Sequence, residues 1–356
     1  MRRRRIGSSR GAARAKHEVS GPRRGPVAAP RSLIAGTPGA AARLLAAAAL
    51  PLLAACITLT ADPRALTWQP TGIIPAQTLR CPAALQLARS ARPAAAVGAA
   101  DALDPDAMRL VTWNIHKQGD AGWQDDLGRF AAAADVLLLQ ETTLEDSLQQ
   151  VLRRADLRWV MASSFIYGSL DIGVLTATRV VPVAACTLRV VEPLLRIPKS
   201  SVITWLPLAG ATQTLAVANV HAINFTLSLD AYRAQLDELA DVLAGHDGPM
   251  VLAGDFNTWS RDRAQVVRAV ALRLGLVEAT FAQDDRTLFL GNQVDHVYVR
   301  GMDVVAAKAF AVTSSDHNPV EVVLRMARPG AQEEGRARPQ WWWPRPAIEP
   351  RSSRAS

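Results

Sequence analysis

Short apolar runs, each about the length of a strand, recur along the chain from Met108 onward and indicate a fold rich in β-strands. Between them, apolar residues spaced three or four apart predict helices at 123–134, 144–153, 229–244 and 261–274. The strand-like runs are RLVTWNI, DVLLLQE, IGVLTAT, VITWLPL, TLAVANVH, PMVLAGDF, VDHVYVR, DVVAAKAF and PVEVVLRM. Many half-buried strands with few helices predict an α/β domain of two sheets packed face to face with helices outside.

The pattern weakens on both sides of this region. Residues 1–43 are rich in Arg, Pro and Gly and have no apolar period, so we expect them to be disordered or to precede the true start. Residues 57–104 are rich in Ala and Pro and poorly periodic, which favours a linker. Residues 327–356 are expected to form a disordered tail, so the folded domain is expected at 105–326.

A separate apolar run, LLAAAALPLLAA, occupies residues 44–55 directly after Arg43. It is too short to cross a bilayer as a helix but matches the central region of a secretory signal. The residues Leu53 to Cys56, LAAC, resemble the lipobox of bacterial lipoproteins, in which the cysteine is lipidated after cleavage. We therefore expect export to the cell envelope or periplasm with an anchor at Cys56. The alternative is a chance apolar stretch in an alanine-rich cytoplasmic protein.

The two other cysteines, Cys81 and Cys186, allow two interpretations. In an exported protein they could pair as a disulfide, because disulfides persist in oxidising compartments. The alternative is a pair of free thiols, one of them in a strand. The sequence alone favours neither.

The charge distribution argues against general affinity for nucleic acid. The whole chain has a formal charge of +8 and a pI of about 10.1, values typical of nucleic-acid binders. However, residues 1–55 hold eleven of the Lys and Arg residues against one Glu, and residues 325–356 hold seven against three acidic residues. The part between them therefore has a net charge of −6. A local basic patch remains compatible with this balance.

The composition limits the kinds of site that this chain can build. A composition of 49 % hydrophobic and 20 % charged residues excludes a disordered chain, and six His with three Cys exclude a multi-zinc protein. A metal site must therefore be built mainly from carboxylates and histidines.

Polar residues that can carry chemistry follow many of the apolar strands. These strand-end residues are Asn114, Gln140, Glu141, His221, Asn224, Asp255, Asn257, Asp295, Asp316 and His317. Each alone is more often a solvated strand edge, but together they offer what a hard divalent cation and a phosphate ester require.

These residues lie in six motifs whose order resembles that of the endonuclease/exonuclease/phosphatase superfamily, the DNase-I-like phosphoesterases. The motifs are WNIHKQ, LLQET, ANVHAINF, GDFNTWS, VDHVYVRG and SDHNPVEV. Three longer stretches, EPLLRIPKS, NVHAINFTLSLDAYRAQL and GDFNTWSRDR, resemble the YafD-like bacterial group within it. The resemblance covers residues 105–326 and implies a four-layered α/β sandwich. In that fold two mainly antiparallel sheets are flanked by helices, and the active site lies at one edge of the sheets.

The same resemblance implies a magnesium (or manganese) site. Glu141 matches the main metal ligand of the family, and Asn114 and Asp316 match residues that complete or orient the metal shell. A bound Mg²⁺ or Mn²⁺ would be the expected cofactor.

The resemblance also implies a catalytic set. Asp255 matches the residue that positions or deprotonates the attacking water, with Asn257 beside it as an orienting and phosphate-binding amide. His317 matches an imidazole that contacts phosphate and is held by Asp295. His221 matches a second histidine, expected to act as a general acid or as a phosphate contact.

Further residues are expected to contact substrate. Many endonuclease relatives have an Asp two positions after the first Asn, where this chain has His116 followed by Lys117, which weakens the case for an abasic-site endonuclease. We expect Lys117, Arg196, Lys199 and Asn224 to bind substrate; the alternative for the cations is that they are solvated loop charges. His296, next to Asp295 in an alternating strand, should face away and is left out.

Together these features predict a divalent-metal-dependent phosphoric-ester hydrolase of nuclease or phosphodiesterase type. A metal-site water would attack phosphorus in line. One alternative is a phosphodiesterase or phosphatase of the cell envelope that acts on lipid headgroups or small molecules. A second is a catalytically silent binding module of the same fold. The substrate is a phosphate ester of nucleic acid, a lipid headgroup or a small molecule, and no protein partner is predicted.

Overall fold

The computed structural model describes residues 57–60, 64–69, 72–75, 80–90 and 101–327. The apolar run at 44–55, Cys56 and the two expected disordered ends lie outside the described residues, apart from Ala327. None of the helices in the described ranges is long and apolar enough to span a membrane.

Two β-sheets form the centre of the fold. The larger sheet has nine strands, in the order β16-β17-β4-β5-β7-β6-β2-β3, with β1 paired to β6. The smaller sheet has six strands, in the order β12-β15-β11-β10-β9-β8, and β13 and β14 form a separate hairpin. The strands of the larger sheet are β1 (Ile57–Thr58), β2 (Arg64–Gln69), β3 (Gly72–Pro75), β4 (Met108–Asn114), β5 (Val136–Thr143), β6 (Arg158–Tyr167), β7 (Leu170–Thr178), β16 (Met302–Ala309) and β17 (Val320–Met326). The others are β8 (Ala184–Val191), β9 (Pro198–Leu206), β10 (Leu215–His221), β11 (Met250–Asp255), β12 (Val277–Glu278), β13 (Leu288–Phe289), β14 (Asn292–Gln293) and β15 (Asp295–Arg300).

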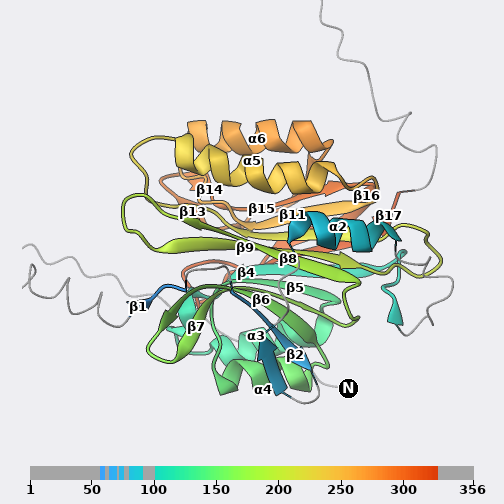
Figure 1. Ribbon diagram of the computed structural model, residues 1–356, viewed down its shortest axis with the longest axis horizontal. Coiled ribbons are helices and arrows are strands. Elements are labelled where there is room, and N and C mark those ends of the chain that lie inside the picture. The colour runs from blue at the N-terminus through green and yellow to red at the C-terminus, as the bar shows by residue number, and fades with distance from the viewer. Residues whose placement is uncertain (1–56, 61–63, 70–71, 76–79, 91–100, 328–356) are drawn as a thin grey trace, which may run out of the picture. The chain divides into compact units, whose positions relative to one another are not determined.

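Helices cover the outer face of each sheet (Figure 1). The helices are α2 (Cys81–Ser90), α3 (Trp123–Ala133), α4 (Asp146–Arg154), α5 (Asp230–Ala244) and α6 (Arg261–Leu274), with a short 3₁₀ turn η3 (His116–Gln118). α3 and α4 pack on the larger sheet, and α2, α5 and α6 pack on the smaller one. A third core, which includes Leu110, Leu138 and Val217, fills the space between the sheets. The predicted four-layered sandwich is therefore confirmed, and the four predicted helices correspond to α3 to α6.

Local chemistry fixes the ends of α6. Ser260 is its N-cap residue and its hydroxyl accepts a hydrogen bond from the Arg263 amide, which satisfies one of the free N–H groups of the first turn. Gly275 ends the helix with a φ of 67°, a left-handed conformation that glycine adopts without a steric penalty. The helix therefore starts directly after the GDFNTW motif and places that motif at the end of β11.

Two pairs of neighbouring strands are parallel, and each needs a crossover helix. β4 and β5 are joined through α3, and β10 and β11 through α5. In each pair the carboxyl ends lie together, so residues that follow one strand meet residues that follow the other. We call the side of the molecule formed by these carboxyl ends the site edge.

The prediction of a linker at 57–104 is wrong for much of that stretch. β2 and β3 extend the larger sheet, and β1 also pairs with β6. The Ala-rich segment at 81–90 is the helix α2, because alanine is the strongest helix former even where it leaves little hydrophobic contrast between faces. The strands were missed because each is short.

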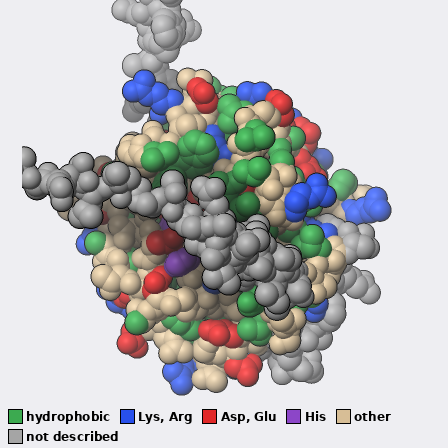
Figure 2. Space-filling model, turned by 90° about the vertical axis from the view of Figure 1, so that its left-hand side faces the viewer, with side chains coloured by type: hydrophobic (Ala, Val, Ile, Leu, Met, Phe, Trp, Pro, Cys, Tyr) green, Lys and Arg blue, Asp and Glu red, His purple; other side chains and the backbone are tan. Residues whose placement is uncertain are grey.

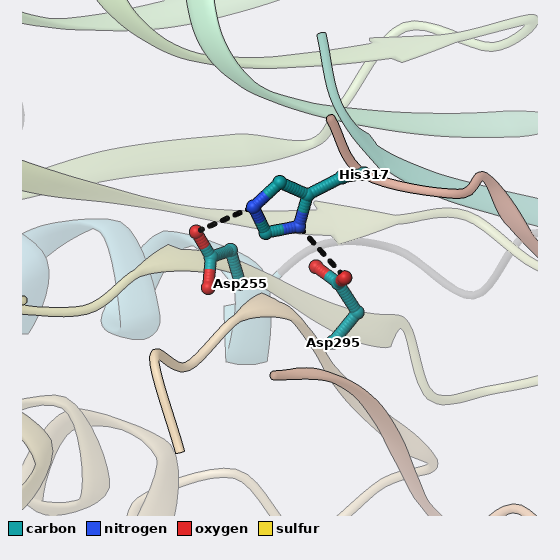
Figure 3. Close-up of side chains that lie close together, drawn as sticks. All are labelled: Asp255, Asp295 and His317. Carbon is teal, nitrogen blue, oxygen red and sulfur yellow. Dashed lines mark hydrogen bonds and ion pairs between the residues drawn. The ribbon is translucent and has the colours of Figure 1, made fainter. Parts of the chain in front are cut away.

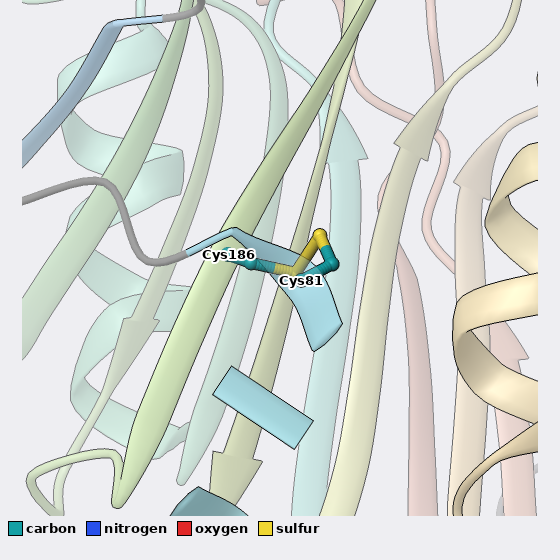
Figure 4. The surroundings of a disulfide bond; sticks show 2 residues. All are labelled: Cys81 and Cys186. Atoms are coloured by element: carbon teal, nitrogen blue, oxygen red, sulfur yellow. A yellow bond between two sulfur atoms is a disulfide. The ribbon is translucent and has the colours of Figure 1, made fainter. Parts of the chain in front are cut away.

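The cysteines Cys81 and Cys186 form a disulfide, with their Cα atoms 5.1 Å apart (Figure 4). Cys81 is the first residue of α2 and Cys186 lies in β8, so the bond ties the helix to the outer face of the smaller sheet. The alternative of two free thiols is thereby excluded in this structure.

Candidate active site

The site edge gathers polar side chains from both sheets. Strand register places Asn114 beside Gln140, the residue before Glu141, at the ends of β4 and β5. In the smaller sheet His221 lies beside Asp255 at the ends of β10 and β11, and Asp255 pairs with Asp295 at the start of β15. Residues separated by up to two hundred positions therefore meet because strand ends meet.

Asp255 is the centre of the cluster and is almost completely buried. Its Oδ2 accepts a hydrogen bond of 3.0 Å from the Asn114 amide across the two sheets. Its Oδ1 accepts a bond of 2.9 Å from the backbone N–H of Asn257. The imidazole Nε2 of His221 lies 3.5 Å from Oδ2. The carboxylate is thus oriented by three neighbours and not by a single ion pair.

Backbone constraints fix where Asp255 lies. Gly254 has a φ of +140°, and a Cβ at this position would lie 2.1 Å from the carbonyl oxygen of Val220. Only glycine permits this close approach of β11 to β10. Asn257 has a φ of 50°, a conformation that asparagine tolerates better than most residues, and its Nδ2 donates to the Ala222 carbonyl at 3.0 Å. The glycine and asparagine of GDFN therefore shape the turn that holds the aspartate.

His317 lies between two carboxylates (Figure 3). Its Nδ1 donates to Asp295 Oδ2 at 2.8 Å, and its Nε2 lies 3.9 Å from Asp255 Oδ2. Burial lowers the pKa of His317, but the charges of Asp295 and Asp255 outweigh burial and raise the pKa to about 10. The imidazole is therefore a cation at neutral pH, with Nδ1 occupied and Nε2–H directed at the site.

Glu141 enters the site through an irregularity in β5. The pairing of β5 with β7 shifts between Leu139 and Thr142, and Glu141 has a φ of 50°. Such a bulge re-aims a side chain, and strained backbone of this kind concentrates at functional sites. The Glu141 carboxylate pairs with the ammonium of Lys117, and Lys199 Nζ lies 3.8 Å from its Oε1.

The charge state of Glu141 follows from these neighbours. Burial raises the pKa of its carboxyl, but the charges of His221, which is protonated only at the low pH where Glu141 titrates, of Lys199 and of Lys117 outweigh burial and lower the pKa to about 2. Glu141 is therefore ionised at every physiological pH.

His221 is neutral in this arrangement. Burial, followed by the charge of Lys199, lowers its pKa to about 4. Lys199 Nζ lies 2.8 Å from His221 Nε2 and donates to it. Nε2 accepts a hydrogen bond and therefore carries no proton. The structure thus disfavours His221 as a general acid and favours the alternative role of a phosphate contact.

The structure brings most of the expected residues together but not all. Asp316 has a side chain that is 59 % exposed and lies 3.9 Å from His116, and its charge also helps to raise the pKa of His317, but within the described residues no contact joins it to Glu141. Asn224 accepts a bond of 3.0 Å from the Trp259 indole, which makes it a loop brace. Arg196 is exposed in the loop before Lys199. The gathered residues are Asn114, Lys117, Glu141, Lys199, His221, Asp255, Asn257, Asp295 and His317.

Two residues that the sequence analysis did not identify, Arg263 and Ser315, form hydrogen bonds to the backbone of the loops that carry the site. Arg263 is buried, and its guanidinium donates to the carbonyls of Ile223, Asn224 and Asn257. Ser315 donates to the Asn114 carbonyl at 2.7 Å and accepts from the His317 amide. The arginine stands in the stretch GDFNTWSRDR, but nothing in its spacing separates it from a solvated helix charge.

A second polar link joins the sheets below the site. Gln140 Nε2 donates to Asn219 Oδ1 at 2.7 Å, and Asn219 Nδ2 donates to the Leu175 carbonyl at 3.0 Å. Both residues are fully buried. Gln140 Oε1 has no partner, but the bonds that the two amides do make favour one relative position of the sheets. His296, by contrast, bonds Glu278 and Thr258 outside the cluster, as its alternation predicts.

A small pocket of about 110 Å³ opens beside Glu141. Its lining includes Lys199 and His221 on the polar side and Phe165, Ile172 and Ile197 on the apolar side. A phosphate ester bound at the site would therefore meet an apolar wall next to the carboxylate.

The donor groups fit a hard divalent cation. Glu141 supplies an ionised carboxylate, and its Oε1 and Asp255 Oδ2 lie 3.7 Å and 3.5 Å from the same His221 nitrogen. The Asn114 amide bonds Asp255 and pairs in register with Gln140, the residue before Glu141. Oxygen donors of this kind suit Mg²⁺ and Mn²⁺. Another group, Asp255, Asp295 and His317, has donor atoms within 4.8 Å of one another. Because His317 is protonated there, that group is better described as an ion-paired set than as a metal cage.

Comparison with known proteins places the chain among relatives of this architecture. The model of the Endonuclease/Exonuclease/phosphatase family matches residues 111–317. A UPF0294 protein from Vibrio campbellii is 41 % identical over 224 residues, which cover 62 % of this chain and 78 % of that protein. A UPF0294 protein from Klebsiella pneumoniae is 37 % identical, over 62 % and 83 % of the two chains. These relatives agree with the narrower bacterial group indicated by the sequence.

Solved structures share the fold. The human Nocturnin catalytic domain, solved with a bound sulfate anion, superposes with a TM-score of 0.50 at 17 % identity, over 64 % of this chain and 96 % of that chain. The endonuclease/exonuclease/phosphatase from Bacteroides vulgatus gives a TM-score of 0.50 at 16 % identity, over 62 % and 99 %. At 16 % and 17 % sequence identity, the similarity to these two structures shows a shared fold alone.

Proposed function

Because the chain belongs to the endonuclease/exonuclease/phosphatase family, we propose that it hydrolyses phosphate esters with the help of a divalent metal ion. The observation that carries this proposal is the pairing of opposite charges at the site edge. A buried carboxylate, Asp255, faces the His317 imidazole, which is protonated at neutral pH, and the ionised Glu141 lies with Asp255 beside the same nitrogen of His221. Hydrolysis of a phosphate ester needs both an acceptor for the proton of water and cations for the phosphoryl oxygens.

The side chains divide these tasks. Asp255 is held by Asn114 and Asn257, so its carboxylate is oriented to align a water and to accept its proton. His317 has its Nδ1 engaged by Asp295, which leaves its Nε2–H to donate to a phosphoryl oxygen. Glu141 and the adjoining Asn114 would hold Mg²⁺ or Mn²⁺, which when bound stabilises negative charge on the phosphate.

Two cationic side chains complete the substrate contacts. Lys117 and Lys199 both lie on the Glu141 carboxylate. If Glu141 held a divalent cation, these ammonium groups would be available to bind phosphate oxygens. We include them among the substrate-binding residues for this reason, together with the exposed Arg196 in the loop that leads to Lys199.

The test is a panel of phosphomonoesters and phosphodiesters, with and without EDTA. It includes bis(p-nitrophenyl) phosphate, single- and double-stranded DNA, RNA and phospholipids. We expect hydrolysis of at least one diester that EDTA abolishes, and loss of about two or more powers of ten in Glu141→Gln, Asp255→Asn and His317→Ala proteins. Asp241→Asn, an exposed carboxylate on α5, is the matched control and should keep full activity. Wild-type turnover in the Glu141→Gln and His317→Ala proteins would refute the proposed mechanism.

We further propose that the protein works in the cell envelope. The disulfide between Cys81 and Cys186 supports this location, because disulfides persist in oxidising compartments and are rare in the cytosol. The LAAC sequence that ends at Cys56 also supports it. Fractionation of cells that express the full chain, with metabolic labelling by palmitate, tests both points. Cytosolic, unlabelled protein with reduced cysteines would contradict the proposal.

A further inference from the structure

Three loops at the site edge carry large apolar side chains that face solvent. They are the loop between β8 and β9, the loop between β10 and α5, and the β13–β14 hairpin. Their exposed side chains, between 48 % and 92 % accessible, form what we call the apolar rim: Leu194, Leu195, Phe225, Leu227, Phe289 and Leu290. Figure 2 views this edge and shows hydrophobic side chains beside a hollow that holds acidic and histidine side chains.

The three loops are connected to one another. The Phe225 amide donates to the buried Glu192 carboxylate at 2.6 Å, which joins the first loop to the second. The Trp259 indole donates to Asn224 in the second loop, and Asn292 of the hairpin donates to the Trp259 carbonyl at 2.9 Å. The rim is therefore a braced surface around the site and not a set of unrelated loop tips.

Exposed apolar side chains are concentrated at this edge. Sixteen large hydrophobic side chains are exposed within the described ranges, and eleven of them lie on loops or strand ends at the site edge. The five others are scattered: Leu87, Val181, Leu272, Val277 and Val305. Single exposed apolar residues are ordinary, but a gathered set marks a surface that is covered in use.

We propose that this edge docks on a lipid bilayer, with the apolar rim inserted among the lipids and the active site facing the headgroups. The second part, that the hydrolysed ester is a lipid headgroup, rests on the proposed function. Bilayer docking accounts for separate apolar tips that surround a polar site, because the tips reach the acyl boundary while the polar centre stays at headgroup level.

The course of the chain supports the same orientation. β1 pairs with β6 through Ile57 and Tyr167, and Tyr167 ends β6 at the site edge. The residue directly before β1 is Cys56, which follows the apolar run at 44–55. A lipid anchor at Cys56 would therefore place the membrane at the edge that carries the rim, with no spacer between the anchor and the folded domain.

The pocket beside Glu141 connects the rim to the site. Ile197, the last residue of the first loop, and Pro198, the first residue of β9, line the same pocket as Glu141 and Lys199. A phosphodiester headgroup entering from the bilayer would pass the apolar wall and meet the cationic and carboxylate groups. Arg196 is exposed between the rim and the pocket, where a cation favours an anionic lipid surface.

Vesicle flotation tests docking without any need for catalysis. The full chain with Cys56→Ser, which removes any acyl group, is mixed with vesicles of phosphatidylethanolamine and phosphatidylglycerol. We expect it to float with the vesicles, and we expect a rim variant, Leu195→Glu with Phe225→Glu and Phe289→Glu, to lose on the order of tenfold or more in partitioning. The matched control changes three exposed apolar residues elsewhere, Leu87→Glu with Leu272→Glu and Val277→Glu, and should float like the parent.

Hydrolysis separates the two parts of the inference. The rim variant should hydrolyse bis(p-nitrophenyl) phosphate at the parent rate, since no rim residue belongs to the catalytic set, but should lose activity on vesicle-borne phospholipid. Rim-dependent flotation with no hydrolysis of any monoester or diester in the panel would support docking and refute the proposed function. Failure of the parent to float, equal flotation of the rim and control variants, or a rim-dependent dimer in sedimentation without vesicle binding would each overturn the docking proposal.

Discussion

The protonation of His317 depends on a neighbour that can be removed without touching the imidazole. Burial lowers the pKa of His317, and the charge and hydrogen bond of Asp295 do much to raise it to about 10. In the Asp295→Asn protein the pKa should fall toward the ordinary value of 6.5, because burial remains and one carboxylate charge is lost. The imidazole resonances in NMR spectra of the metal-free protein would report this pKa directly.

The raised pKa of His317 determines the direction in which stability and activity change with pH. A group whose pKa is higher in the folded state contributes stability below its unfolded value of 6.5 and loses it as the pH rises toward 10. Wild-type activity should therefore persist to alkaline pH. In Asp295→Asn, the alkaline fall in activity should occur at a lower pH, because His317 loses its proton earlier. Asp303→Asn, which affects only a pair with Arg325, is the control. An unchanged titration of His317 would show that Asp295 does not set its charge.

Arg263 offers a second prediction at the residue scale. Its guanidinium donates to three loop carbonyls and stacks on the Tyr232 and Trp259 rings. Arg263→Met should lower the free energy of unfolding by about 3 kcal/mol or more, because buried carbonyls lose their donors. Activity should fall as well, since the turn that holds Asp255 loses its support.

Arg268 supplies the control for that substitution. It lies on the same helix and is exposed, so Arg268→Met should leave both the unfolding midpoint and the activity unchanged. Denaturant unfolding measures the difference between the two variants. Equal midpoints would mean that the contacts of Arg263 contribute nothing to the turn.

The sequence predicted which residues could meet but not how they pair. Motif order identified Asp255, Asp295 and His317, and these residues do lie together. It did not reveal that Lys199 donates to His221, because the two come from different strands and a side-chain contact has no signature in local spacing. Asp316 was expected at the metal on motif grounds alone, yet its side chain turns to solvent.

At the scale of elements, α2 depends on one covalent link and a small apolar face. The disulfide of Cys81 and Cys186 closes a loop of 105 residues, for which the chain-entropy model gives about 4.7 kcal/mol of stabilisation. Dithiothreitol should therefore lower the melting temperature of the wild-type protein. The Cys81→Ala, Cys186→Ala protein should melt at that lower temperature and should not respond to the reductant.

The site itself should tolerate the loss of that link. α2 packs on the outer face of the smaller sheet, in a core that reaches Ala222 and Phe256 but includes none of the gathered site residues. Activity per folded molecule should thus remain within about a factor of two when the disulfide is reduced, an estimate that treats distant sites as independent. A melting temperature insensitive to reduction would show that α2 is held by packing alone.

Prediction of the elements succeeded where hydrophobic contrast was strong. The helices α3 to α6 have clear apolar faces, and the central strands are continuous apolar runs. α2 and β1 to β3 failed because an alanine-rich helix has little contrast and the strands are of two to six residues. A disulfide partner in β8 is a long-range constraint that no local pattern reports.

At the scale of the whole molecule, the site exists because each sheet contains one parallel pair. The crossover helices α3 and α5 bring the ends of β4, β5, β10 and β11 to a single edge. The hydrogen bond from Asn114 to Asp255 then joins the two sheets at that edge. Displacement of one sheet relative to the other would separate these groups, so the stability of the domain and the geometry of the site are linked.

Because the site and the domain are linked in this way, we expect a metal ion bound at the site to stabilise the whole folded domain. Glu141 and Asp255 place two carboxylates beside the same nitrogen of His221. A divalent cation that binds only the folded state should raise its stability by about 2.7 kcal/mol at one hundred times the dissociation constant. Titration with Mg²⁺ and Mn²⁺ should therefore raise the melting temperature of the wild-type protein, and Glu141→Gln should abolish the rise while Asp241→Asn preserves it. Calorimetry without substrate separates this outcome from catalysis. Absence of any heat or thermal shift with either cation would favour a catalytically silent module of the same fold over a metal-dependent hydrolase.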